Sequence, residues 1–130
     1  MNKNQLTQLG LITDAAFQAA QSKLAVEIQR ESQLRESLKM LEVDQRARAA
    51  EISDRLDPAM QAGADVRWRG WIEQRRRLIT SEMALCRAAQ ENLRAIAAQK
   101  FGRHQAALAL NRAHAAQTKL EAIRRERYTS

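Results

Sequence analysis

The chain has one proline in 130 residues, Pro58, and this strong helix breaker lies close to the middle of the sequence. A proline fixes its own φ and drives the preceding residue, here Asp57, away from the α-helical region. Gly63 tolerates left-handed backbone angles, and Asp65 is a good N-cap for a helix that follows it. We therefore expect one turn near residues 57–65, with a long uninterrupted element on each side of it.

The composition indicates that both elements are helices. Ala, Leu, Arg, Glu and Lys make up 70 of the 130 residues, which is typical of coiled coils and long helices. Leu, Ile, Val and Phe number only 26, too few for a compact globular core to offset the entropy of the chain. With four glycines and one proline, the frequent turns of a β fold cannot be built.

Apolar residues recur at steps of three and four along both arms, as on the face of a helix. In the first arm, residues 4–56, polar side chains interrupt this stripe at Glu31, Gln45 and Arg48. In the second arm, residues 66–126, the stripe is broad and rich in alanine. Apart from its alanines, the stripe consists of Trp71, Ile72, Leu78, Ile79, Leu85, Cys86, Leu93, Ile96, Leu110, Leu120 and Ile123.

A long isolated helix must cover its apolar stripe, and a short turn makes the other arm the nearest cover. The sequence therefore predicts an all-α fold: one domain, residues 1–130, forming a long antiparallel two-helix hairpin or coiled coil. Each arm would be about 85–90 Å long at 1.5 Å per residue. Two helices leave part of each stripe uncovered, so we expect another protein or a second copy to fill it.

Charge is distributed unevenly between the arms. Residues 1–57 hold 8 basic and 9 acidic residues, whereas residues 58–130 hold 14 and 6, which gives the net charge of +7. The excess lies just after the turn and at the C-terminus, so both ends of the hairpin are expected to be positive. The arginines concerned are Arg67, Arg69, Arg75, Arg76, Arg77, Arg124, Arg125 and Arg127.

No combination of residues predicts catalysis, a cofactor or a metal. His104 and His114 are ten residues apart, not the three or four that bring two imidazoles together on a helix, so we interpret both as surface residues. Cys86 fits a buried structural thiol. The lone cysteine, the absence of a signal peptide and the lack of 18 consecutive apolar residues predict a cytoplasmic protein without direct membrane insertion.

The segment Arg67–Ile79 is the most unusual in the chain, because it combines two of its five aromatic residues with five arginines. Trp68 and Trp71 could staple the end of the hairpin. They could also form a recognition surface, since Trp and Arg are enriched at binding hot spots. Both interpretations stay open at this point.

A basic chain of this length, with one mid-chain break followed by Arg67-Trp68-Arg69-Gly70-Trp71 and then Leu78, Ile79 and Leu85, resembles the FliJ family of flagellar type III export proteins and its YscO-type injectisome relatives. The resemblance implies a non-enzymatic central stalk that links a hexameric export ATPase to the cytoplasmic domain of a membrane export gate. It implies a peripheral location at the inner membrane and export chaperones as further partners. It does not separate flagellar from virulence-type export.

The resemblance also assigns two partner-binding sites. The turn-proximal site would face the export gate and consists of Arg67, Trp68, Trp71, Arg75, Leu78 and Leu85. The terminal site would enter the pore of the ATPase and consists of Leu6, Leu9, Arg124, Arg125 and Arg127.

Two other functions fit the residues. The chain could be a generic coiled-coil scaffold or export chaperone that self-associates through its uncovered stripe. It could also be a basic coiled-coil protein that binds nucleic acid, as its pI near 10.5 suggests. Against specific nucleic-acid binding, acidic residues are interspersed along both arms and no recognition motif is present.

Overall fold

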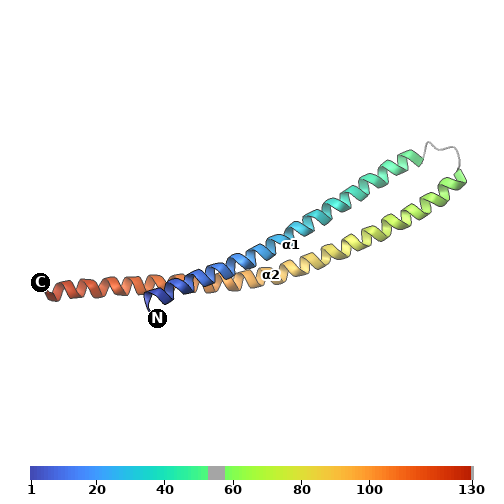
Figure 1. Cartoon of the computed structure of the whole chain (residues 1–130). Helices are drawn as coiled ribbons and strands as arrows, with labels where there is room; N and C mark the ends of the chain where they lie inside the picture. Colours follow the sequence, from blue (N-terminus) through green and yellow to red (C-terminus); the bar gives the residue numbers. More distant parts are fainter. Residues whose placement is uncertain (53–57, 130) are drawn as a thin grey trace. The chain divides into compact units, whose positions relative to one another are not determined.

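The computed structural model describes residues 1–52 and 58–129, all of them helical except the first two. Helix α1 spans Lys3–Ile52 and helix α2 spans Pro58–Thr129, and the two pack against each other as an antiparallel hairpin (Figure 1). The predicted all-α hairpin is thus confirmed. Residues 53–57, which hold the end of the predicted first helix and Asp57, lie outside the described residues.

Helix α2 begins eight residues earlier than predicted, because residues 58–65 are helical rather than part of the turn. Proline is favourable at the first position of a helix, where its missing N–H has no helical partner to lose. Gly63 has no positive φ, and Asp65 pairs with Arg69 at 2.9 Å within the helix instead of capping it. The predicted roles of Gly63 and Asp65 are therefore wrong.

The start of α1 is fixed by a reciprocal pair of hydrogen bonds. The backbone N–H of Gln5 donates to Oδ1 of Asn2 at 2.9 Å, and the backbone N–H of Asn2 donates to Oε1 of Gln5 at 3.0 Å. This capping box satisfies two backbone donors that the first turn leaves without helical partners. The other helix, α2, continues without a break through Gly70 and Gly102.

The chain divides into two compact units, each of which contains part of both helices. The turn-proximal unit is residues 25–91, and the terminal unit combines residues 1–24 with residues 92–130. The core of the turn-proximal unit consists of four buried residues with three half-buried ones packed on them. These are Leu41, Ile72, Ile79 and Met83, with Leu34, Leu38 and Trp68.

Glu31 joins the two helices of the turn-proximal unit. Its carboxylate accepts hydrogen bonds from Nε2 of the buried Gln90 at 2.7 Å and from Nε of Arg87 at 3.0 Å, both on α2. Arg35, on its own helix, donates at 2.9 Å. The bond from Gln90, and then that from Arg87, lowers the pKa of Glu31. A polar residue in a coiled-coil seam commonly fixes the register of the two helices, and Glu31 has the partners to do so.

The other two polar interruptions predicted in α1 also have partners on α2. Oε1 of Gln45 accepts a hydrogen bond from Nη2 of Arg76 at 3.0 Å. The guanidinium carbon of Arg48 lies 5.1 Å from the centre of the Trp68 ring, in the range of a cation–π contact. All three interruptions are therefore cross-helix contacts at seam positions.

In the terminal unit, small and aromatic side chains fill the seam. Its buried residues are Leu6, Ala20, Ala97 and Ala107. The rings of Phe17 and Phe101 lie 5.3 Å apart. The alanine-rich stripe predicted for α2 thus contributes Ala97 and Ala107 to the interior of this unit.

His104 belongs to the seam of the terminal unit rather than to the surface, which corrects the prediction. Nδ1 of His104 forms a hydrogen bond of 3.0 Å with the Thr13 hydroxyl, whose oxygen also lies 2.9 Å from the Leu9 carbonyl oxygen. Its Nε2 lies 3.8 Å from a carboxylate oxygen of Asp14. Likewise, His114 is half-buried.

Candidate functional site

The structure divides the broad apolar stripe predicted for α2 into two faces. Ile72 and Cys86 are each 1% exposed, and Ile79 is buried between them along the seam. The residue before each of these is exposed instead: Trp71 is 55% exposed, Leu78 52% and Leu85 70%. Consecutive residues of a helix point about 100° apart, so neighbours in the sequence lie on different faces.

Trp71, Leu78 and Leu85 follow one another at seven-residue intervals, and intermediate positions continue the pattern in steps of three and four. We call this surface the outer face of α2. All of its members are exposed and none is charged. At 3.5 residues per turn the outer face points about 150° away from the seam. Its members are Trp71, Gln74, Leu78, Ser81, Leu85 and Ala88.

Arginines lie around the first half of the outer face. Arg67 precedes Trp71 by four residues, and Arg75 lies between Trp71 and Leu78 on one flank. Both are exposed and neither pairs with a carboxylate among the described residues. On the other flank, Arg77 reaches Glu73 only at 4.0 Å. The Trp71 end of the outer face is therefore basic.

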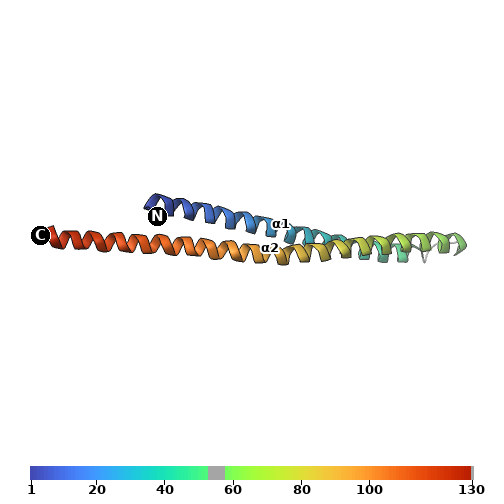
Figure 2. The ribbon, with the colours of Figure 1, turned by 90° about the horizontal axis from the view of Figure 1, so that it is seen from below.

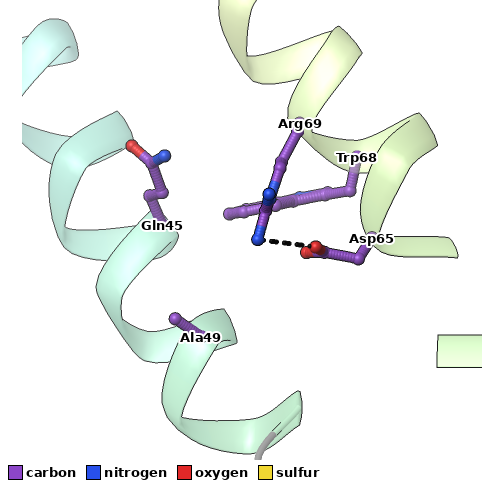
Figure 3. A pocket seen from close by; sticks show the side chains of 5 residues that line it. All are labelled: Gln45, Ala49, Asp65, Trp68 and Arg69. Atoms are coloured by element: carbon purple, nitrogen blue, oxygen red, sulfur yellow. Dashed lines mark ion pairs between the residues drawn. The ribbon is translucent and has the colours of Figure 1, made fainter. Parts of the chain in front are cut away.

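Trp68, the second predicted tryptophan, has a different role. It is half-buried, packs on the core of the turn-proximal unit and carries the guanidinium of Arg48 over its ring. It lines a small open cavity of about 340 Å³. Figure 3 shows it beside the ion pair of Arg69 and Asp65. The remaining cavity residues, Gln45 and Ala49, come from α1. The staple interpretation thus suits Trp68, and the recognition interpretation suits Trp71.

The terminal site divides in a similar way. Leu6 is 4% exposed and Leu9 is half-buried, so Leu6 belongs to the interior of the terminal unit. The start of α1 at Lys3 lies beside residues 111–122 of α2, and α2 continues past it to its C-terminal end (Figures 1 and 2). Its last turns carry the predicted arginines, all of them exposed: Arg124, Arg125 and Arg127.

The described residues hold no cluster of metal ligands and a cysteine whose thiol has a raised pKa. Within residues 1–52 and 58–129, no three His, Cys, Asp or Glu side chains come together as metal ligands. Burial raises the pKa of the Cys86 thiol, and a hydrogen bond with Glu27 raises it further, as in a structural cysteine. In the same residues, no helix is both long and apolar enough to cross a membrane.

No family model, curated protein or solved structure matches the chain. Its site is therefore defined by geometry: an exposed, uncharged, helical face with basic flanks on a hairpin that is packed on its other side. The sequence predicted Trp71, Leu78 and Leu85 for this site but missed Gln74, Ser81 and Ala88. The absence of charge at six successive positions, spaced alternately three and four residues apart, was the signal that could have identified them.

Proposed function

We propose that the chain is a non-enzymatic coupling component of a type III protein export apparatus, which links a hexameric export ATPase to the cytoplasmic domain of the membrane export gate. The observation that carries this proposal is the outer face of α2. A soluble helix gains little from exposing Trp71, Leu78 and Leu85 unless a partner covers them. The surface lies near the turn, where the resemblance to the FliJ family places the gate contact.

In this proposal Trp71, Leu78 and Leu85 contact the gate directly, while Arg67 and Arg75 surround the contact. Buried aromatic residues at the centre of an interface contribute most to affinity, and charges at its rim mainly speed association. Trp68 contributes by position, because it holds the end of the hairpin that presents Trp71. The protein would then be located in the cytoplasm at the inner-membrane apparatus.

The ATPase contact is proposed for the C-terminal end of α2. Arg124, Arg125 and Arg127 are exposed where α2 continues past α1, so they can meet acidic residues in a pore without unfolding the terminal unit. Since Leu6 is buried, it supports this end from within. Leu9 would reach the ATPase only through its exposed part.

The self-associating scaffold stays a second candidate because α1 also has an exposed apolar surface. Val26 is 65% exposed, and Met40 and Val43 are each 52% exposed. If these residues of one chain pack against the same residues of a second copy, the purified chain is a stable dimer at micromolar concentration. Sedimentation velocity gives this result directly, and a monomer favours the stalk.

A pull-down at physiological salt tests the proposal. The purified chain is incubated with the export ATPase and with the gate domain of the type III system from the same source. We expect deletion of residues 121–130 to abolish ATPase capture and Trp71→Ala to abolish gate capture. Met40→Ala is the matched control, because Met40 is 52% exposed and Trp71 55% exposed, on helices of the same unit. Capture of neither partner by the intact chain would refute the proposal.

A further inference from the structure

We infer that the outer face of α2 binds one amphipathic helix of the partner, with apolar side chains every seven residues and acidic residues opposite the Trp71 end. This inference deepens the proposed function and rests on it for the identity of the protein that carries the helix. The class of ligand follows from three properties of the surface, namely its spacing, its length and its charge.

The spacing of the outer face fits a helix and no other regular element. Trp71, Leu78 and Leu85 are separated by about 10.5 Å along the axis, at 1.5 Å per residue. Side chains on one face of an extended strand repeat every 6.7 Å or so, so a strand would soon be out of step with them. A helix with an apolar residue at every seventh position repeats at the same distance and stays in step.

The length of the face fixes the size of the ligand. From Trp71 to Ala88 it extends about 26 Å, which corresponds to five turns, or about 18 residues, of a partner helix. Gln74, Ser81 and Ala88 are smaller than the three apolar residues, so larger side chains of the partner can lie over them.

Charge gives the ligand a direction. Arg67 and Arg75 lie at the Trp71 end without carboxylate partners among the described residues, whereas Glu82 lies on the flank between Leu78 and Leu85. Acidic residues on the partner helix would therefore lie near Trp71, and neutral or basic ones near Leu85. Since opposite charges steer association and like charges oppose it, one orientation of the partner helix is favoured.

A second copy of the chain is a poorer occupant. The exposed surface of α1 around Met40 carries Glu36 and is flanked by Lys39, Asp44 and Arg46, so its charges are mixed. It offers no acidic side to oppose Arg67 and Arg75. Dimerisation through the outer face is an outcome of the test below and would overturn the inference.

Synthetic peptides test the ligand class without any export protein. Three fluorescent 21-residue peptides are titrated with the full chain, and binding is followed by anisotropy. The first is a three-heptad helix with Leu on one face and Glu on its flanks. The second replaces Glu with Lys, and the third has the composition of the first with Leu at every second position. Each is used below the concentration at which it self-associates.

We expect the Glu-flanked helix to bind, the Lys-flanked helix to bind at least tenfold more weakly, and the alternating peptide not to bind. Trp71→Ala should lower the affinity of the chain for the first peptide by about tenfold or more, as at a hot spot. The double variant Arg67→Gln and Arg75→Gln should reduce the difference between the charged peptides to less than threefold. Met40→Ala should leave the affinities for all three peptides unchanged.

Equal affinity for the Glu-flanked and Lys-flanked helices, an equal effect of Met40→Ala and Trp71→Ala, or loss of binding because the chain dimerises through Trp71 would overturn the inference. These failures are distinct from failure of the proposed function. A chain that binds the Glu-flanked helix but captures neither gate nor ATPase has the inferred surface and serves another system. A chain that captures the gate but ignores all three peptides has the proposed function and a different mode of contact.

Discussion

Two neighbouring substitutions, Ile72→Ala and Trp71→Ala, should differ in how far they lower stability, because the two side chains lie on different faces of α2. Ile72 is 1% exposed in the core of the turn-proximal unit. Replacing it with Ala removes three buried carbon atoms, worth about 2.4 kcal/mol at 0.8 kcal/mol each. A residual cavity adds to this, within the 2–5 kcal/mol typical of such changes. We expect the free energy of unfolding to fall by about 2.5–3 kcal/mol, and Tm by roughly 10 °C.

Trp71→Ala removes a larger side chain but should cost less than about 1 kcal/mol of stability, because Trp71 is 55% exposed and contributes little to the seam. Urea denaturation followed by circular dichroism at 222 nm measures both variants. Trp68 offers a local signal, since in Trp71→Phe it is the only tryptophan left, and it packs on the same core as Ile72. In the double variant Trp71→Phe, Ile72→Ala, the fluorescence of Trp68 then reports how far the Ile72 substitution destabilises the turn-proximal unit alone.

Two results would refute this assignment of faces. A cost below 1 kcal/mol for Ile72→Ala would mean that Ile72 is not enclosed between the helices. A cost for Trp71→Ala equal to that for Ile72→Ala would mean that the outer face supports the fold, and then loss of partner binding by Trp71→Ala could not be attributed to lost contact.

Other changes test further features of the structure. The pKa of Glu31 is lowered in the folded chain. Its stabilising contribution is therefore complete above the pKa of an unfolded Glu and is lost as the pH falls through the folded pKa. Glu31→Gln should flatten the acid side of a plot of unfolding free energy against pH. Gly70→Ala and Gly102→Ala should each raise the free energy of unfolding by about 0.5–1 kcal/mol, since an added Cβ meets no atom within 4 Å at either position, and thermal denaturation checks this. Cys86, buried and with a raised pKa, should react with iodoacetamide at pH 8 at least about tenfold more slowly in the native chain than in urea.

The fold was predictable because its main determinants are local and repetitive. A single Pro58 in a chain of good helix formers leaves room for only two long helices. The end of the turn was predicted less well, because Gly63 and Asp65 suit a turn or a cap in isolation. Proline is equally suited to the first helical position, and the helix that follows Pro58 contains both residues.

The apolar members of the candidate site were predictable, but the face of the helix on which they lie was not. Trp71–Ile72, Leu78–Ile79 and Leu85–Cys86 are adjacent pairs repeated every seven residues, so either member of each pair could face α1. Only the packing against α1 decides, and it buries the second member of each pair. Similarly, the place of His104 in the seam cannot be predicted from its neighbours, because its partners, Thr13 and Asp14, are far away in the sequence.

The position of the outer face, about 150° from the seam, has a consequence for how a partner binds. A partner helix can dock on Trp71, Leu78 and Leu85 while α1 stays in place, so binding requires no opening of the hairpin. If the partner instead replaced α1, it would compete for Ile72 and Ile79, and a substitution that weakens the α1–α2 contact would favour it. Leu41→Ala separates the two mechanisms, because Leu41 lies in the same core but on α1, so the change weakens the α1–α2 contact and leaves the surface of α2 intact. Unchanged affinity for the partner indicates docking on the intact hairpin, whereas tighter binding by the destabilised variant indicates exchange of α1.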